Sequence, residues 1–225
     1  MKISQPAKLA DCTLQGSEST TELFIVEGDS ASQAVIRIRD AQFQAVLPMQ
    51  GKPLNAWKAN EKKVRANVFM GALIESIGCD IGGAFSQSAC RYRSIILLFD
   101  PDADGIHCGT LMLLFFYRWM RPLLDVGRIA IVRPPMMELV ADNLETSLLA
   151  FSDEEGQRIS FELEQDGKKN ILKKRFRGLA SLNADILKRH CVDPNTRGII
   201  PLTAHDAESS IKMIAALSSP AGYHS

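Results

Sequence analysis

The sequence predicts an α/β fold, in which a mostly parallel β-sheet is flanked by helices and followed by a C-terminal tail. Short apolar runs at 22–26, 44–47 and 94–99 alternate with longer segments whose apolar residues recur at helical spacing, which is typical of βαβ units. The run that ends at Phe99 is apolar throughout, as in a parallel strand buried on both faces. With 46% hydrophobic residues, the 225-residue chain also has enough apolar material for a sizeable core.

The expected elements follow one another in a regular order. Residues 1–21 are polar and are expected to be irregular. The sequence then predicts a strand at 22–26, a helix at 30–39, a strand at 44–47, a helix at 64–77, a loop at 82–88, a strand at 94–99, a helix at 105–121 and a strand at 128–132. Gly78 is expected to cap the helix at 64–77, and the helix at 105–121 is apolar on nearly all sides, which indicates a central position.

Beyond residue 138 the pattern weakens and acidic residues dominate. The alternating piece 158–163 has the pattern of a short strand, and helices are expected at 183–190, with Asn183 as the N-cap, and at 206–217. We therefore divide the chain into a core, residues 1–140, and a second part, residues 141–225, that holds an insertion and the tail.

Charge and cysteine content limit the functional classes. The formal net charge is zero, so any affinity for nucleic acid must come from local basic patches. Five cysteines without a C-x-x-C pair indicate a reduced, cytoplasmic chain with neither a disulfide framework nor a zinc site. The first residues lack the apolar region of a signal peptide, and Arg118 and Arg121 interrupt the one long apolar run before it reaches membrane-spanning length.

Three carboxylates, Asp100, Asp102 and Asp104, follow the central apolar run at alternate positions. Pro101 cannot continue a strand ladder, so the acids lie at the carboxyl end of the strand, where open α/β sheets bind their ligands. Carboxylates this close raise one another's pKa unless a cation neutralises them. The cation that such oxygen ligands prefer is Mg²⁺ or Mn²⁺.

This acidic cluster also has two other interpretations. A turn that caps the following helix needs no metal and stays open as an alternative. An EF-hand loop, whose first six positions the sequence matches, is excluded because its twelfth position is Leu111 instead of glutamate and because an apolar run, not a polar helix, precedes it.

A second acid, Glu27, ends the earlier apolar strand and is followed by a glycine turn and a helix start at Ser30. The pair of motifs, Glu27-Gly28-Asp29-Ser30-Ala31 and Asp100-x-Asp102-x-Asp104-Gly105-x-His107, resembles the two acidic motifs of the TOPRIM domain, most closely as it occurs in the B subunits of type IIA DNA topoisomerases. Further collinear blocks agree with this likeness, at residues 8–12, 44–48, 51–55, 77–79, 110–118, 134–135 and 177–179.

The resemblance implies a Rossmann-like TOPRIM sheet and a site for DNA cleavage and religation. It implies that Glu27 acts as the acid/base and also contributes to the metal site, that Asp100 and Asp102 hold Mg²⁺ or Mn²⁺, and that Asp104 is the third acidic ligand. In the family the attacking tyrosine lies on a separate A-type subunit, which is therefore the expected partner besides DNA; homodimerisation stays open. The three tyrosines of this chain, Tyr92, Tyr117 and Tyr223, lie in no matching context.

DNA phosphates are expected to contact Lys52 in the turn after the second strand, His107 beside the acids, and Lys174, Arg175 and Arg177 in a basic run. The alternative for the basic residues is an ordinary solvated face, and for His107 a hydrogen-bonding support.

The chain also departs from the family pattern. It lacks the ATPase module and transducer, so we expect no ATP site in it. Ser32-Gln33 stand where the family has two glycines, Gly109 stands where it has an arginine, and Ser181 where it has a glutamate. A stand-alone metal-dependent TOPRIM nuclease and a non-catalytic relative that binds DNA or a partner protein therefore remain alternatives.

Overall fold

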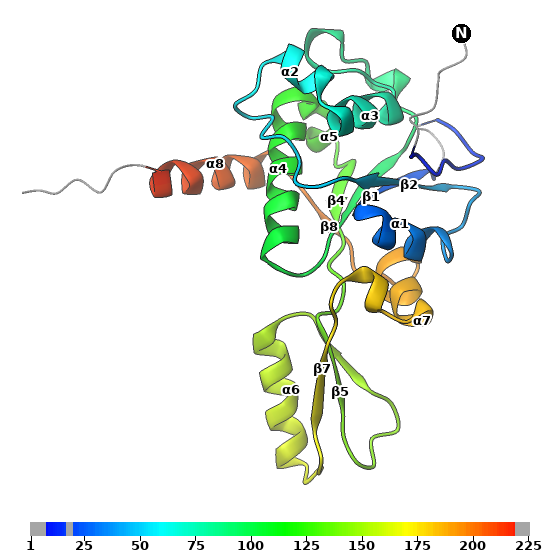
Figure 1. Ribbon diagram of the computed structural model, residues 1–225, viewed down its shortest axis with the longest axis vertical. Helices are drawn as coiled ribbons and strands as arrows, with labels where there is room; N and C mark the ends of the chain where they lie inside the picture. The colour runs from blue at the N-terminus through cyan, green and yellow to red at the C-terminus, as the bar shows by residue number, and fades with distance from the viewer. Residues whose placement is uncertain (1–7, 17–19, 219–225) are drawn as a thin grey trace, which may run out of the picture.

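The computed structural model describes residues 8–16 and 20–218. It has a larger α/β body and a smaller unit, made of one sheet and one helix, that extends from it (Figure 1). Of the polar segment 1–21, the described residues form only an isolated bridge, Ala10 with Val46, so the irregular structure expected there is confirmed for them.

A five-stranded sheet forms the centre of the body, in the order β2-β1-β3-β4-β8. Its strands are β1 (Glu22–Glu27), β2 (Gln44–Met49), β3 (Ser94–Leu98), β4 (Ile129–Ile131) and β8 (Ile200–Pro201). The first four run parallel, and only β8 is antiparallel to its neighbour. The mostly parallel sheet that the apolar runs predicted is confirmed.

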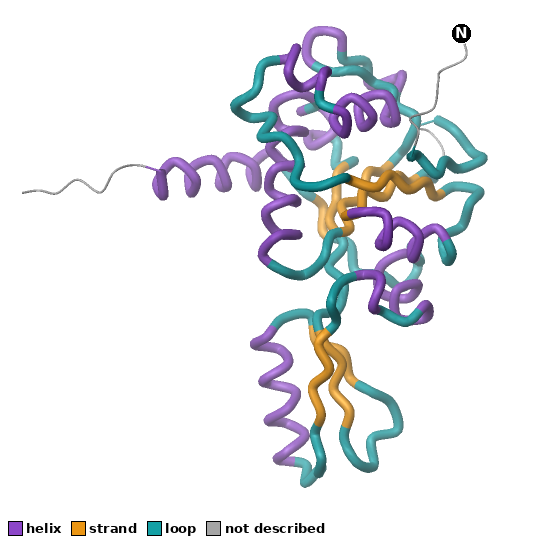
Figure 2. Tube along the Cα trace, viewed as in Figure 1, coloured by secondary structure: helices purple, strands orange, loops and turns teal. Residues whose placement is uncertain are grey.

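Helices cover both faces of this sheet (Figure 2). Outside the smaller unit, the described helices are α1 (Gly28–Ile36), α2 (Glu61–Ala66), α3 (Val68–Ile77), α4 (Ala103–Trp119), α5 (Arg121–Asp125), α7 (Ala184–Leu187) and α8 (Ala204–Ser218), with short 3₁₀ turns at Gly82–Ala84, Gln87–Ala89 and Leu179–Ser181 and a π-helical turn at Lys188–Val192. Successive side chains of a strand point to opposite faces. Leu23 and Ile25 of β1 therefore pack with α3 and α4, whereas Phe24 and Val26 pack with α1 and α7.

Two of the predicted helices begin or end at other residues in the structure than the sequence predicted. The helix expected at 64–77 is two helices, because Asn67 adopts an extended backbone and its side chain accepts a hydrogen bond from the Met70 amide, which starts α3 anew. Gly78 ends α3 with φ 82°, as predicted. The helix expected at 105–121 begins at Ala103 and ends at Trp119, since Met120 leaves helical geometry before α5.

The smaller unit is an antiparallel sheet of β5 (Met137–Val140), β6 (Leu148–Ala150) and β7 (Leu172–Arg175), in the order β6-β5-β7, with α6 (Asp153–Gln165) on one face. The strand predicted at 158–163 is wrong, because these residues lie in α6. Ser152 caps that helix, and Ile159 and Leu163, one turn apart, bury the face that meets the sheet.

The chain then returns to the body. Asn183 caps α7 as predicted, accepting a hydrogen bond from the Ile186 amide at 2.8 Å. The helix expected at 183–190 is only partly regular, since α7 passes into the π-helical turn. The helix expected at 206–217 is confirmed as α8, whose first turns meet α4 through a bond from the Tyr117 hydroxyl to Glu208 (3.0 Å) before the helix extends away from the body (Figure 1).

An ion pair between Arg197 and Glu22 joins this returning segment to β1. The guanidinium makes two hydrogen bonds to the Glu22 carboxylate, one of them 2.9 Å long, and the two side chains are only 4% and 10% exposed. Gln44 of β2 adds a third bond to the same carboxylate, at 2.9 Å. Because the pair is nearly buried, removing one partner would leave an uncompensated charge in the core.

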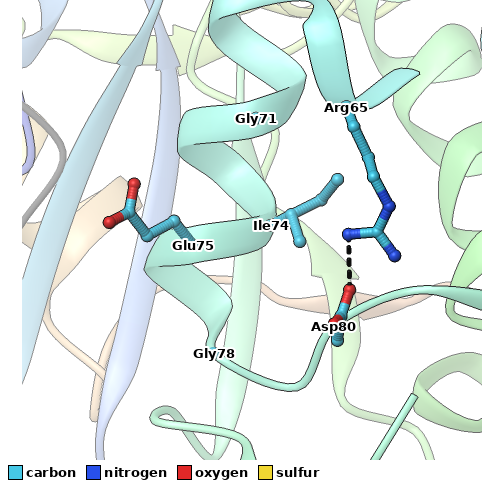
Figure 3. Close-up of a pocket in the computed structure, with 6 residues that line it drawn as sticks. All are labelled: Arg65, Gly71, Ile74, Glu75, Gly78 and Asp80. Atoms are coloured by element: carbon cyan, nitrogen blue, oxygen red, sulfur yellow. Dashed lines mark hydrogen bonds and ion pairs between the residues drawn. The ribbon is translucent and has the colours of Figure 1, made fainter. Parts of the chain in front are cut away.

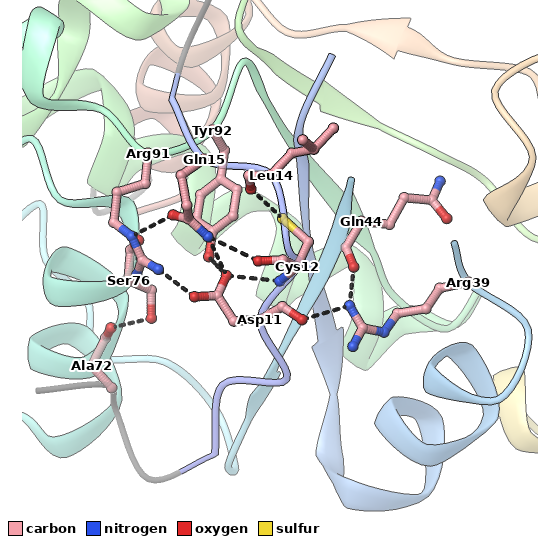
Figure 4. Close-up of polar contacts among 10 residues, drawn as sticks. All are labelled: Asp11, Cys12, Leu14, Gln15, Arg39, Gln44, Ala72, Ser76, Arg91 and Tyr92. Carbon is pink, nitrogen blue, oxygen red and sulfur yellow. Dashed lines mark hydrogen bonds and ion pairs between the residues drawn. The ribbon is translucent and has the colours of Figure 1, made fainter. Parts of the chain in front are cut away.

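A polar network fastens the segment 8–16 across the body. Figure 4 shows the Asp11 carboxylate at its centre, where it accepts hydrogen bonds from the Tyr92 hydroxyl (2.7 Å) and from the Arg91 guanidinium. Gln15 also donates to Asp11 and accepts from Arg91. This network ties Asp11 and Gln15 of the segment to Arg91 and Tyr92, next to β3.

All five cysteines are buried and unpaired. Among residues 8–16 and 20–218, no helix combines the length and the apolarity needed to span a bilayer.

We predict that Arg197→Leu lowers the free energy of unfolding by about 3 kcal/mol, because the Glu22 charge then stays buried without its partner. Chemical denaturation monitored by circular dichroism measures this change. The double variant Glu22→Leu/Arg197→Leu removes both charges and should recover part of the loss. If the single and double variants were equally stable, the unpaired charge of Glu22 would not be the cause of the loss.

Candidate functional site

The candidate site lies at the carboxyl end of β1 and β3, which are neighbours in the sheet. Their parallel register pairs Val26 with Leu98. Glu27, the last residue of β1, therefore stands beside the point where β3 leads into Asp100. The structure thus brings together the two acidic motifs that are far apart in the sequence.

Each of the three aspartates has a different local environment. Asp102 is the N-cap of α4, and its side chain accepts a hydrogen bond from the Gly105 amide at 2.8 Å. Asp104, exposed in the first turn of α4, forms an ion pair with Lys52 at 2.8 Å. Asp100 is half-buried and accepts a hydrogen bond from the Leu179 amide at 2.8 Å. The alternative interpretation of the cluster, a turn that caps the following helix, is therefore confirmed for Asp102 but does not explain Asp100 and Asp104.

The carboxylates act on one another electrostatically. Burial raises the pKa of Glu27, and the negative charges of Asp100, Asp102 and Asp104 raise it further. Burial also raises the pKa of Asp100, in spite of its hydrogen bond from the Leu179 amide. The mutual repulsion that the spacing of the acids predicted is therefore present in the folded protein.

Lys52 compensates part of this negative charge. Its hydrogen bond and ion pair hold the pKa of Asp104 below the ordinary value, and its charge also opposes the rise in the pKa of Glu27. The interaction raises the pKa of Lys52 itself, so the ammonium stays protonated. Lys52 lies in the loop that follows β2, where the sequence predicted a cation beside the acids.

The donor chemistry of the acids fits a hard divalent cation, since four carboxylates gather at one edge and repel one another. In the part of the chain that the structure describes, however, no three side chains of histidine, cysteine, aspartate or glutamate converge closely enough to hold a metal ion. Two of the three aspartates face other protein groups, since Asp102 accepts from the Gly105 amide and Asp104 pairs with Lys52. Binding a metal would require the Asp102 and Asp104 side chains to turn toward a point that they share with Asp100.

The structure separates the predicted phosphate-binding residues into two groups. Lys52 and Arg177 lie beside the acids, and Arg177 lines a cleft together with Glu27 and Asp100. His107, exposed on α4, is close enough that its charge acts on Asp104.

The other two predicted cations lie on β7, in the smaller unit. Lys174 faces Glu138 at 3.8 Å, and Arg175 forms an ion pair with Asp153 at 2.6 Å. They are not part of the cluster around the acids.

A basic stretch follows Lys52 in the sequence, with Lys58, Lys62, Lys63 and Arg65. One of these cations is used within the fold. Arg65 forms an ion pair with Asp80 at 2.8 Å, and both residues line a pocket beside α3 (Figure 3). A second ion pair joins Arg65 to Glu61, also at 2.8 Å.

Sequence reasoning missed two contacts of the site. Lys8 forms an ion pair with Asp29, two residues after Glu27 in the sequence, at 2.9 Å. The amide of Leu179 reaches Asp100 from 79 residues away. A backbone amide has no signature in the sequence, so only the neighbouring Arg177-Gly178-Leu179 block could have drawn attention to this loop.

Comparison with known proteins supports the resemblance. The model of the Toprim domain, a family that binds divalent metal ions, matches residues 22–134. The DNA gyrase B subunits of Archaeoglobus fulgidus and of Thermotoga maritima are each 40% identical over 94% of this chain and 32% of their own length. The DNA gyrase B subunit of Halalkalibacterium halodurans is 40% identical over 91% of this chain and 31% of its own length. The chain thus spans about a third of the length of these curated relatives.

We predict that Lys52→Ala raises the pKa of Glu27, because the variant loses a positive charge that now opposes the rise. The pKa of Asp104 should also rise toward its ordinary value, since its hydrogen bond to Lys52 is lost. Both carboxylates would then ionise at higher pH than in the parent protein. Carbon-detected NMR titration of the side-chain carboxyl groups measures the two pKa values.

Lys58→Ala is the matched control, because Lys58 is exposed in the same basic stretch and has no part in the shifts of either acid. A Glu27 pKa that is unchanged in Lys52→Ala, or that moves equally in the control, would refute this electrostatic coupling.

Proposed function

Because the chain belongs to the Toprim family, we propose that it is the metal-binding part of the DNA cleavage and religation centre of a type IIA DNA topoisomerase, of the gyrase B kind. The observation that carries the proposal is the juxtaposition of Glu27 with Asp100, Asp102 and Asp104 at one sheet edge. The similarity to the B subunits of DNA gyrase supports it.

In this proposal Asp100 and Asp102 hold Mg²⁺ or Mn²⁺, with Asp104 as the third acidic ligand and Glu27 completing the site. The bound metal would neutralise charge at the scissile phosphate and at the oxygen that attacks or leaves. Glu27 exchanges a proton with that oxygen. Its raised pKa suits this role, because it retains its proton at higher pH than an ordinary glutamate.

The cations beside the acids serve to bind DNA. Lys52, His107 and Arg177 would contact phosphates near the scissile bond, and Lys174 and Arg175 would contact the duplex from the smaller unit. Lys52 can exchange its ion pair with Asp104 for a phosphate once a metal neutralises the acids. Because phosphate contacts carry no sequence information, we expect this chain to position DNA without selecting its sequence.

The attacking tyrosine would come from an A-type partner subunit. The Tyr92 hydroxyl is buried and donates a hydrogen bond to Asp11, and that of Tyr117 donates to Glu208 on α8. Burial and its hydrogen bond to Asp11 raise the pKa of Tyr92, which makes it a poor nucleophile. Tyr223 lies outside the described residues. We propose the cytoplasm as the compartment, because five unpaired cysteines suit a reducing environment.

We predict that this chain, supplied with an A-type subunit and Mg²⁺ or Mn²⁺, supports cleavage of supercoiled plasmid, and that Glu27→Gln reduces the cleavage rate by roughly 10²- to 10³-fold through loss of the acid/base. Covalent attachment of the A-type subunit to the 5′ end of the DNA is the product to measure. Cleavage by this chain alone would instead identify a metal-dependent nuclease. If the DNA stays intact under every condition, the chain is a non-catalytic relative that only binds DNA or a partner protein.

We also predict that Asp102→Asn weakens Mn²⁺ binding but leaves the fold intact. Asparagine caps helices as well as aspartate does, so the bond from the Gly105 amide can persist while the ligand charge is lost. Isothermal titration and thermal denaturation measure the two properties. Asp125→Asn, an exposed acid on α5, is the control. Unchanged Mn²⁺ affinity of Asp102→Asn would remove Asp102 from the ligand set.

A further inference from the structure

The loop 177–181 connects the smaller unit to the acids. Strand β7 ends at Arg175, and the Phe176 amide continues the pairing by donating to Met136 at 3.0 Å. Gly178 and Leu179 then lie directly against Asp100. The last residues of the inserted sheet are therefore within a few positions of the metal site that we propose.

The Leu179 amide is held firmly in place. The Leu179 side chain is 1% exposed and packs with Phe24 and Val26 in the cluster on the α1 face of the sheet. Leu179 also begins a 3₁₀ turn, in which Ser181 accepts a hydrogen bond from the Arg177 amide at 2.9 Å and donates one to the Gly178 carbonyl at 2.7 Å. The N–H that reaches Asp100 is therefore fixed by the core on one side and by a closed turn on the other.

Two glycines let Asp100 fit into this position. Gly178 has φ 129°, and a Cβ built there would lie 2.5 Å from Oδ2 of Asp100. On the other side, a Cβ on Gly105 would lie 2.0 Å from the Asp100 carbonyl oxygen. Any larger residue at 178 would thus meet the carboxylate itself, in a backbone conformation that side chains rarely adopt.

We propose that the Gly178–Leu179 loop is the positioning element of Asp100. The Leu179 amide donates to Oδ1 and Gly178 leaves room for Oδ2, so this loop sets the orientation of the carboxylate that we propose as a metal ligand. This inference rests on the proposed function, since it assumes that Asp100 is a metal ligand. A hydrogen bond that orients a metal ligand typically accounts for a 10- to 100-fold difference in metal affinity.

The decisive comparison is between Leu179→Pro and Leu179→Ala in the full chain. Proline lacks the N–H and is tolerated at the first position of a helical turn, whereas alanine keeps the N–H and loses the packing of the leucine side chain. We expect Leu179→Pro to bind Mn²⁺ roughly 10- to 100-fold more weakly than Leu179→Ala. Mn²⁺ titration by electron paramagnetic resonance measures the affinity, and thermal denaturation should give similar midpoints for the two variants.

Gly178→Ala tests the same contact by displacing the carboxylate, and we expect a comparable loss of Mn²⁺ affinity. Its control is Gly198→Ala, because a Cβ at Gly198 would meet nothing within 4 Å. If Leu179→Pro does not fold, Ser181→Ala decides the question, since it loosens the turn at an exposed residue. A several-fold weaker affinity for Mn²⁺ would support the inference, and an unchanged affinity would overturn it.

Asp100→Asn separates this inference from the proposed function. If Asp100→Asn binds Mn²⁺ as the parent does, Asp100 is not a ligand and the metal assignment in the proposed function fails. If Asp100→Asn binds weakly but Leu179→Pro matches Leu179→Ala, the metal assignment stands and the positioning role of the loop is overturned.

Discussion

The hydrogen-bonded pairing of β1 with β3 is the constraint on which the candidate site depends. The two strands are separated along the chain by β2 and α3, yet they lie side by side with Val26 opposite Leu98. Their register is fixed because both faces are buried, and a slip by one residue would exchange the side chains of the two hydrophobic clusters. The same register carries Glu27 to the aspartates, so the packing of the core and the geometry of the acids cannot vary independently.

Each of the three aspartates interacts with a protein group. Lys52 neutralises Asp104, the Gly105 amide satisfies Asp102, and the Leu179 amide satisfies Asp100. Burial disfavours the charged forms of Glu27 and of Asp100, and neighbouring aspartates add to this effect at both. The pKa is thus raised in two carboxyl groups of the site, and one of them, Glu27, is the group to which we assign proton exchange; shifted pKa values are common in catalytic acids.

Most of the large sheet and the cluster of acids at its edge could be predicted from the sequence. A buried strand is a run of apolar residues, and the proline or glycine that follows it shows where the strand ends. The strand predicted at 158–163 is wrong because the apolar residues of so short a segment fit both the two-residue period of a strand and the 3.6-residue period of a helix. Only the packing of Ile159 and Leu163 against the small sheet shows that the segment is helical. The split at Asn67 depends on one side-chain cap. The contact of Leu179 with Asp100 was beyond prediction, since it joins a backbone amide to a side chain across 79 residues. The residues of the basic run lie in two parts of the fold. Arg177 lines the cleft beside the acids, whereas Lys174 and Arg175 lie on strand β7 of the small sheet.

Both outer strands of the large sheet are poor templates for intermolecular pairing. Strand β2 contains Pro48 and is bridged by Ala10, and β8 is two residues long and ends in Pro201. At the small sheet, the outer strand β7 carries Lys173 and Lys174. Short, proline-containing or charged borders discourage strand addition by a neighbouring molecule. We therefore expect these three borders to be poor sites for intermolecular β-sheet extension, so that contacts with other molecules would use the helices and loops instead.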